Sequence, residues 1–413
     1  MRVKSLSLEN IGPFIQADME FFTDADATPP VVLITGENGT GKSIIVDAIR
    51  GMFGYLYGTI ERDIRRKERS GQASIEVTLE AAQESLHLKA TEFLSDYRIT
   101  PKPKAIASIP LGVQKTGACP NWVVDFWPST LASGSYKIDT FTNPKHILFL
   151  NDSLQGTKAK SDITQLICHF DYMRDSRDTQ EQATGKRLYE ITEEIIASSL
   201  LEGGRLSHVA RTTYDPIIIQ NGQPVSLANL SGGNSYLIQN LVSLLGKMYA
   251  VHVLRETPLD ELCQTPGLLL IDEAENQLHP KWQKRLMRTI LDIFPNLQII
   301  ATTHSPFIIS SVSNARLYVC QNKQDHCVVV DETAQYANKP VDEILMSPLF
   351  ESTRPFGEEI SRLMAQREQA IQDGDEQKRA EKEAELQALN PEYFGYFNVD
   401  KLLEEIAAGG AAA

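Results

Sequence analysis

The sequence predicts an α/β fold with a mixed or parallel sheet at its core, and three observations support this prediction. A complete G-x-x-x-x-G-K-S motif at 36–43 follows the apolar run 31–34 and precedes residues at helical spacing. Two later apolar runs, 268–271 and 299–301, have the length and composition of buried strands. With 413 residues and 42% hydrophobic content, the chain can form one large domain with insertions, or two lobes.

Composition limits the functions open to the chain. Its five cysteines are odd in number and lack metal-ligand spacing, so we expect free thiols in a reducing compartment. We find no apolar signal core at the N-terminus and no stretch that approaches the length of a membrane span, so we expect a cytoplasmic protein without membrane contact. The formal net charge of −14 restricts any nucleic-acid contact to a local patch.

The N-terminal lobe is expected to be an antiparallel β structure. Residues 2–14 alternate polar and apolar side chains, and 18–22 offers a second strand before the phosphate-loop strand. Beyond the motif, 44–53 has one apolar helical face. Further along, 74–79 alternates clearly, and 85–89 is its predicted hairpin partner.

The rest of the chain alternates helical and strand patterns. Residues 99–121 predict an irregular surface loop, and 162–199 has the periodicity of a helical insertion. A hairpin is expected at 216–222, followed by an amphipathic helix to about residue 252. Highly charged helical sequence then covers 355–390.

These patterns divide the chain into four parts. They are an N-terminal lobe with the motif and a β subdomain at 1–160, a helical insertion at 161–225, a second lobe at 226–345 and a charged helical segment at 346–413. The predicted helices are short, so the chain lacks the coiled coil of hundreds of residues that a long-armed ATPase needs between its halves.

The motif at 36–43 predicts a nucleotide site. Its glycine-rich turn points backbone N–H groups at phosphates, and the following helix adds the positive end of its dipole. Lys42 is expected to reach the β- and γ-phosphates, and Ser43 to ligate Mg²⁺. The predicted loop comprises Gly36, Glu37, Asn38, Gly39, Thr40, Gly41, Lys42 and Ser43.

The apolar run 268–271 ends in Asp272 and Glu273, which suit phosphoryl chemistry. An aspartate there can hold Mg²⁺, usually through water, and the next glutamate can polarise the attacking water. The alternative interpretation is a core strand with a solvated acidic end. Because the same chain contains a phosphate loop, the catalytic interpretation is favoured.

Two further positions add to this site. Ser231, Gly232 and Gly233 open the predicted helix to 252, whose N-terminus suits an anion such as a γ-phosphate, although Ser-Gly-Gly is also a common helix cap. His304 follows the strand 298–302, where a histidine can sense a phosphate or be purely structural.

In this order the motifs resemble those of ABC-type ATPases of the SMC/RecF class, from about residue 1 to 330. Leu230-Ser231-Gly232-Gly233 resembles the signature motif, with Asn234 in place of the usual Gln or Glu, and His304 resembles the switch histidine that orients the catalytic water. Residues 275–280 resemble the D-loop at the dimer interface, and Leu278-His279-Pro280 is similar to the RecF-like and overcoming-lysogenisation-defect-like branch.

The opening at 10–14 also resembles this class, but Gly12 and Pro13 stand where a basic residue is often found. The resemblance further implies a glutamine that senses Mg²⁺ between the two halves. Gln155 in Leu-Gln-Gly is the first candidate, and Gln114 and Gln72 remain alternatives.

The resemblance implies a composite site and an ATP-dependent homodimer or higher oligomer. The phosphate loop, Asp272 and Glu273 would bind Mg-ATP on one subunit, while Ser231 and Gly233 of another subunit would cap the γ-phosphate. Hydrolysis would loosen that dimer, which couples nucleotide state to interface geometry.

Three functions are compatible with a nucleotide site of this kind. No Toprim, HNH or zinc-nuclease pattern is visible, and the chain resembles the compact Septu (PtuA-like) and retron-associated ATPases, which implies antiphage defence with a separately encoded effector nuclease. A RecF-like DNA-repair ATPase acting on DNA ends or gaps is the alternative. A transporter subunit fits less well, because of the long spacing from Ser43 to Ser231 and the two strands before the phosphate loop.

The best candidate for a DNA patch lies at 61–69, although its interleaved acidic residues also fit a solvated charged face. Its basic residues are Arg62, Arg65, Arg66, Lys67 and Arg69, with Lys102, Lys104, Lys158 and Lys160 as supplements.

Overall fold

The structure is a computed structural model. It describes residues 1–22, 31–54, 73–81, 84–91, 98–100, 121–130, 134–143, 150, 154, 156, 159–200, 203–350 and 356–397. Contacts divide the chain into two compact units, Met1–Ile344 and Leu345–Ala413.

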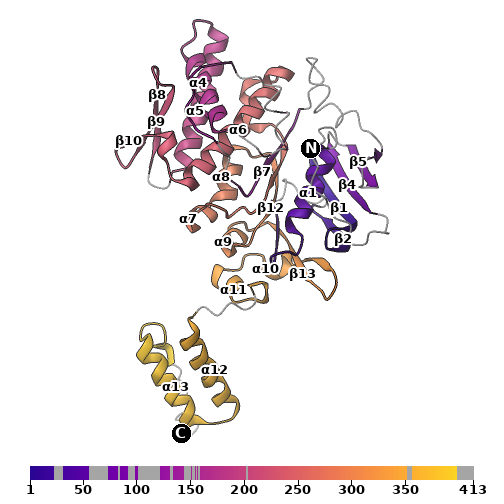
Figure 1. The fold of residues 1–413 in the computed structure, drawn as a ribbon, viewed down its shortest axis with the longest axis vertical. Coiled ribbons are helices and arrows are strands. Elements are labelled where there is room, and N and C mark those ends of the chain that lie inside the picture. Colours follow the sequence, from indigo (N-terminus) through magenta and orange to yellow (C-terminus); the bar gives the residue numbers. More distant parts are fainter. Residues whose placement is uncertain are drawn as a thin grey trace, which may run out of the picture. The chain divides into compact units, whose positions relative to one another are not determined.

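A large mixed sheet forms the centre of the first unit (Figure 1). Among the described residues it has eleven strands, in the order β6-β5-β4-β1-β2-β14-β13-β3-β12-β11-β7. Their bounds are β1 (Arg2–Ile11), β2 (Phe14–Glu20), β3 (Val31–Gly36), β4 (Ser74–Ala81), β5 (Glu84–Thr91), β6 (Arg98–Thr100), β7 (Val123–Trp127), β11 (Gly267–Ile271), β12 (Leu297–Thr302), β13 (Arg316–Asn322) and β14 (Cys327–Asp331).

The half of the sheet from β13 to β7 is parallel. Every residue of β3, β7, β11 and β12 is buried, as expected for a parallel sheet that is covered on both faces. Parallel strands bring their carboxyl ends to one edge of a sheet. The ends of β3, β11 and β12 therefore carry the phosphate loop, the Asp272-Glu273 pair and His304 to the same edge.

The predicted antiparallel lobe forms, but it is not a separate sheet. β1 pairs with β2 and β4, and β4 pairs with β5, all antiparallel. A single parallel bridge, Phe14 with Cys327, joins β2 to β14 and so makes one continuous sheet. The turn before β2 is also held by the hairpin of β13 and β14, because the Cys327 N–H donates to the Pro13 carbonyl over 2.9 Å.

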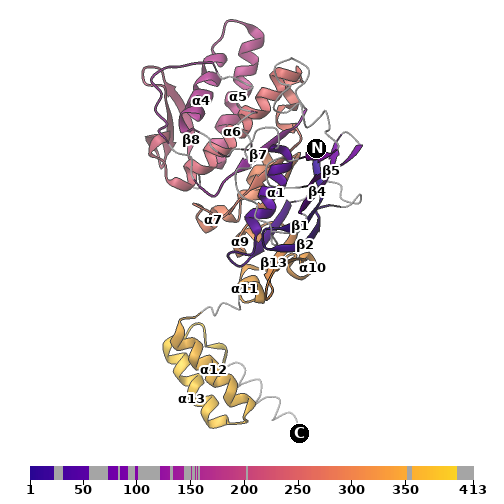
Figure 2. The same ribbon diagram turned by 45° about the vertical axis from the view of Figure 1, so that its right-hand side comes forward.

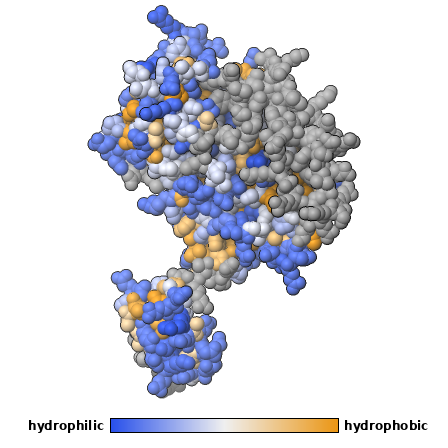
Figure 3. Space-filling view, viewed as in Figure 1, coloured by the Kyte–Doolittle hydropathy of each residue, from blue (hydrophilic) through white to orange (hydrophobic). Residues whose placement is uncertain are grey.

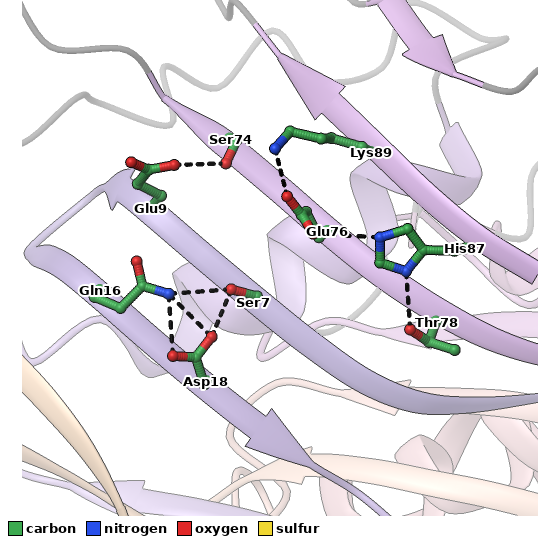
Figure 4. A network of polar contacts seen from close by, with 9 residues as sticks. All are labelled: Ser7, Glu9, Gln16, Asp18, Ser74, Glu76, Thr78, His87 and Lys89. Atoms are coloured by element: carbon green, nitrogen blue, oxygen red, sulfur yellow. Dashed lines mark hydrogen bonds and ion pairs between the residues drawn. The ribbon is translucent and has the colours of Figure 1, made fainter.

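One face of this antiparallel half is polar (Figure 4). Ser7 on β1 donates to Asp18 on β2 over 2.5 Å, and Lys89 on β5 pairs with Glu76 on β4 over 2.5 Å. Alternate residues of β1, among them Leu6 and Leu8, are buried in the core. This alternation is what the sequence pattern of residues 2–14 predicts.

The predicted helical insertion is confirmed as two antiparallel helices that lie beside α6 (Figure 2). Asp178 separates them, since its side chain accepts from the N–H groups of Gln180 and Glu181 and begins a new helix. The predicted hairpin forms as β9 and β10 in a three-stranded sheet with β8. These elements are α4 (Lys160–Arg174), α5 (Thr179–Ser198), β8 (Arg205–Ala210), β9 (Asp215–Gln220) and β10 (Gln223–Ser226).

Helix α6 (Gly232–Arg255) is the buried helix of this region. Its Lys247, 2% exposed, forms an ion pair with Asp125 of β7, which is 0% exposed. The same carboxylate accepts from the Phe126 N–H over 3.0 Å and from Trp127 Nε1 over 2.9 Å. Charges this deeply buried are tolerated only when paired and hydrogen-bonded, so this contact ties α6 to one register on β7.

By length and hydropathy alone α6 could cross a membrane, which differs from the expectation that no stretch approaches such a span. In the structure 83% of the apolar window is buried within the first unit. The apolar sequence of α6 therefore belongs to a core helix.

Shorter helices complete the first unit around the sheet. They are α1 (Lys42–Gly54), α7 (Pro280–Gln283), α8 (Leu286–Ile293), α9 (Pro306–Ile309), α10 (Thr333–Tyr336) and α11 (Val341–Leu345).

The second unit contains a helical hairpin, α12 (Glu358–Gln372) and α13 (Glu376–Leu389). Leu363, Leu386, Phe394 and Phe397 form its small core. Most of its visible surface is hydrophilic, with a few apolar side chains (Figure 3). Glu383 is shared between Arg367 and Arg379 and links the two helices at that surface. The charged sequence thus folds as a paired hairpin, with its turn near residue 374.

Candidate nucleotide-binding site

The phosphate loop (36–43) connects β3 to α1, and α1 begins at Lys42. Gly36 has a φ of 136°, and a Cβ built there would lie 2.2 Å from the Cys320 carbonyl oxygen on β13. Only glycine fits this position, for both reasons. Inside the loop, Thr40 Oγ1 donates to the Glu37 carbonyl over 2.8 Å. The loop is therefore built from close backbone approaches, which leave the helix N-terminus open toward an anion.

Lys42 crosses this loop. Its ammonium donates to the carbonyls of Gly36 over 3.0 Å and Glu37 over 2.7 Å, and the residue is buried. Burial lowers the pKa of Lys42, while Cys320 and nearby carboxylates that include Glu275 and Asp272 raise it. The positive charge of Lys42 thus lies in a partly desolvated place beside the phosphate loop, with carboxylates nearby.

Asp272 joins the phosphate loop to the neighbouring strands. Ser43 Oγ donates to Asp272 Oδ1 over 2.9 Å, and Thr302 Oγ1 at the end of β12 donates to the same oxygen over 2.7 Å. Neither bond uses Oδ2. Thr302 was not among the sequence-predicted residues, because a threonine at the end of a buried strand is a common strand residue.

This pair fits a magnesium ion. Hydroxyl and carboxylate oxygens are the hard ligands that Mg²⁺ prefers, and a serine that ligates through its lone pair can still donate its proton to a carboxylate. The described residues hold no cluster of three or more His, Cys, Asp or Glu that could bind a metal. A magnesium ion at Ser43 and Asp272 would therefore need phosphate and water oxygens as its other ligands.

Glu273 opens the acidic loop, which we define as residues 272–279 between β11 and α7. Its φ of 52° is left-handed, and its N–H donates to Thr302 Oγ1 over 2.7 Å. A glutamate in this conformation is uncommon, and such positions concentrate at functional sites. The turn directs the chain away from β11 just after Asp272, and Glu273 is exposed at the edge of the sheet.

Glu275 in the same loop holds the segment after β12. Glu275 Oε2 accepts from Thr303 Oγ1 over 2.7 Å, and Oε1 accepts from the His304 N–H over 2.6 Å. Glu275 belongs to the D-loop-like segment 275–280, but its contact with the segment after β12 could not be predicted from the sequence.

His304 is half-buried beside these groups. Burial lowers its pKa most, the charge of Lys42 lowers it further, and Glu275, Glu273 and Asp272 act in the opposite direction. The imidazole is thus favoured in its neutral form near pH 7, in which one ring nitrogen can accept a hydrogen bond.

The signature-like residues contact the acidic loop of their own chain. Ser231 is the N-cap of α6, but its side chain makes no capping hydrogen bond. A Cβ on Gly233 would lie 2.7 Å from the Gln277 carbonyl oxygen, whereas one on Gly232 would lie 3.7 Å from its nearest neighbour, Gln277 Oε1. Gly233 is therefore needed for the close approach of α6 to the acidic loop.

Several predicted residues lie outside the described part of the chain. They are the glutamine candidates Gln155, Gln114 and Gln72, the basic cluster Arg62, Arg65, Arg66, Lys67 and Arg69, and the supplements Lys102, Lys104 and Lys158. Lys160, the remaining supplement, is described at the start of α4, with its ammonium 5.5 Å from the centre of the Tyr136 ring.

Two family models match the chain. One, described as an AAA domain, matches 5–115, and the other, an AAA domain whose description names the AbiEii toxin of a Type IV TA system, matches 130–310. The first covers the phosphate loop, and the second covers Ser231, Asp272, Glu273 and His304.

Curated proteins of two kinds are similar. Septu protein PtuA of Bacillus thuringiensis is 25% identical over 83% of this chain and 83% of its own length. Retron Vc95 probable ATPase of Vibrio cholerae is 29% identical over 42% of this chain, and Retron Ec83 probable ATPase of Escherichia coli is 28% identical over 30%. Over these ranges the chain is similar to Septu protein PtuA and to the two retron ATPases. The matched parts span 34% of the Vibrio protein and 22% of the Escherichia protein.

Solved structures with a similar fold include SMC head domains. That of Thermotoga maritima is 17% identical with a TM-score of 0.45, covering 80% of this chain and 99% of its own. The Smc head domain of Pyrococcus furiosus, bound to the C-terminal domain of ScpA, is 13% identical with a TM-score of 0.47, covering 83% and 99%.

Together the similar curated proteins and the mixed sheet confirm the predicted resemblance and the α/β fold class. The family matches support ATPase activity and nucleotide binding with a divalent metal.

Proposed function

We propose that this chain hydrolyses Mg-ATP in a site completed by a second copy of the chain. The observation that carries the proposal is the bond between Ser43 Oγ and Asp272 Oδ1, which joins the phosphate loop to the acidic loop at one sheet edge. Lys42 and His304 lie in the same electrostatic environment. When bound, Mg-ATP would supply a γ-phosphoryl group whose negative charge the metal partly neutralises.

Each residue has a task in this proposal. Lys42 and the N–H groups of 36–43 bind phosphate oxygens, and Ser43 and Asp272 hold the metal. Glu273 orients and polarises the attacking water, and neutral His304 accepts a hydrogen bond near the γ-phosphate. Ser231 and Gly233 at the N-terminus of α6 cap the phosphate of the partner copy.

The composite site is tested with Glu273→Gln, which keeps the shape of the side chain and removes its charge. We expect ATP binding to persist, hydrolysis to fall about 100-fold or more, and an ATP-dependent dimer to accumulate in analytical ultracentrifugation. Glu261→Gln, at an exposed acid in the segment Leu259–Gln264, is the matched control and should behave as wild type.

Either of two results would contradict the proposal. Hydrolysis at the wild-type rate by Glu273→Gln would remove Glu273 as the catalytic base. Tight ATP binding without any change of oligomeric state would show that one chain suffices.

We further propose that the nucleotide state controls a separately encoded effector nuclease in antiphage defence. The similarity to Septu PtuA over 83% of both chains supports this reading. The test begins with the reading frames that neighbour the gene, and any nuclease encoded there is co-expressed with this chain. DNA cleavage by the purified pair should differ about 5- to 150-fold between Glu273→Gln with ATP and Lys42→Ala. Equal cleavage in the two states would mean that ATP does not control the effector.

A further inference from the structure

Glu275 uses both carboxylate oxygens to hold the segment that carries His304. One oxygen accepts from the Thr303 hydroxyl over 2.7 Å and the other from the His304 main-chain N–H over 2.6 Å. Hydrogen bonds to a charged acceptor are stronger than neutral ones. These two strong bonds join loops that are almost thirty residues apart in the sequence.

The acidic loop holds the main chain of Glu275 in place. The Ala274 N–H donates to the Thr302 carbonyl over 2.9 Å, Ala274 is fully buried, and the Leu278 N–H donates to the Glu275 carbonyl over 3.0 Å. The main chain of Glu275 is thus held on both sides before its side chain reaches the loop after β12. Because its main chain is fixed, the Glu275 carboxylate can set the position of the Thr303 and His304 groups that it binds.

The partner segment is organised around the same contact. Thr303 Oγ1 donates to Glu275 and also accepts from the Ser305 N–H over 3.0 Å, and Ser305 is the N-cap of α9. The Thr303 N–H, in contrast, donates to the Ile34 carbonyl on β3 over 2.9 Å. Successive amides at 303 and 304 are therefore held by different elements, one by the sheet and one by Glu275.

We propose that Glu275 is a positioning residue that fixes the main chain of His304 at the nucleotide site. The inference rests on the proposed function, in which His304 contacts the γ-phosphate. Glu275 contacts the backbone of His304 and acts through it. Its loss should leave the phosphate loop and Lys42 intact and impair the catalytic step.

The kinetic test compares Glu275→Ala, Glu275→Gln, His304→Ala and the double variant Glu275→Ala/His304→Ala. Misplacing His304 should lower kcat of Glu275→Ala about 10- to 100-fold, with KM within about threefold of wild type. Glu275→Gln keeps an oxygen acceptor for the His304 N–H and should recover most of kcat. The double variant should be no slower than His304→Ala alone, because both changes remove one function.

A second measurement does not depend on hydrolysis. Residue-resolved amide hydrogen exchange of the nucleotide-free protein should show the His304 amide exchanging at least about tenfold faster in Glu275→Ala. The Thr303 amide, bonded to Ile34, is the internal control and should keep its rate. Asn276→Ala is the matched variant, since Asn276 Nδ2 bonds to the Ser129 carbonyl, and it should leave His304 exchange unchanged.

The outcomes distinguish the positioning role of Glu275 from the role of His304 in ATP hydrolysis. Unchanged His304 exchange in Glu275→Ala, a raised KM with unchanged kcat, or multiplicative losses in the double variant would each overturn the positioning role. If His304→Ala hydrolysed ATP at the wild-type rate, the role of His304 in the proposed function would fall. The exchange data would still decide whether Glu275 holds this segment.

Discussion

The phosphate loop and the acidic loop meet at Asp272 but are held in different ways. The phosphate loop is held mostly by contacts among its own residues, through the Thr40 hydroxyl on the Glu37 carbonyl and the Lys42 ammonium on the carbonyls of Gly36 and Glu37. The acidic loop is held by contacts from distant parts of the chain, with Thr302 at one end and Gly233 of α6 at the other. A local motif specifies the first loop, whereas tertiary packing specifies the second.

The largest expected effect comes from removing a distant support. Lys247→Ala leaves the Asp125 carboxylate buried and unpaired, so the free energy of unfolding should fall by about 3–5 kcal/mol. Urea denaturation followed by circular dichroism measures it. The double variant Asp125→Leu/Lys247→Met should regain much of this loss, and a stable single variant would show that α6 is not anchored by this pair.

The next effect tests the locally built loop. Lys42→Ala should lower ATP hydrolysis by about 10²–10³-fold, because a preorganised cation at the developing charge is lost. The melting temperature should change little, because burial already disfavours the charged ammonium of Lys42 and offsets the two hydrogen bonds that are lost. Nucleotide binding by fluorescence and a thermal scan measure both quantities. A large loss of stability would contradict the distinction between the two loops.

A smaller effect is expected where α6 meets the acidic loop. In Gly233→Ala the new methyl group meets the Gln277 carbonyl at 2.7 Å, so the protein should lose about 1–3 kcal/mol and the ATP-dependent dimer should weaken. Gly232→Ala is the matched control, with 3.7 Å to its nearest neighbour. Denaturant unfolding and ultracentrifugation compare them, and equal behaviour of the two variants would remove the proposed close contact.

The smallest effect is a shift in pH dependence. Burial and Lys42 lower the pKa of His304, so its neutral form persists to a lower pH than in a free histidine of pKa 6.5. Activity lost on protonation of His304 should therefore decline with an apparent pKa below 6.5. A profile of kcat/KM from pH 5 to 8 measures this, because kcat/KM reports the groups of the nucleotide-free protein, and the decline should disappear in His304→Ala. An apparent pKa above 6.5 would mean that the carboxylates outweigh burial.

The difference between the two loops also explains which parts of the site could be predicted from the sequence. The motifs at 36–43, 272–273 and 304 each follow a buried strand, which predicts that their residues meet, because parallel strands share an edge. Glu275, Thr302 and Thr303 could not be assigned from the sequence, since their roles exist only where β11 and β12 lie side by side. The bridge from Phe14 to Cys327 was equally invisible, as one pair of residues joins strands distant in sequence.

The ion pair between Lys247 and Asp125 constrains how the signature-like residues can move. A helix that slides along a sheet must exchange its contacts, and here an intermediate position would separate two opposite charges in a dry interior. α6 is therefore free to tilt or to travel together with β7, but not to slip past it. Any displacement of Ser231 and Gly233 is then shared by β7 and by its neighbour β11, whose end carries Asp272.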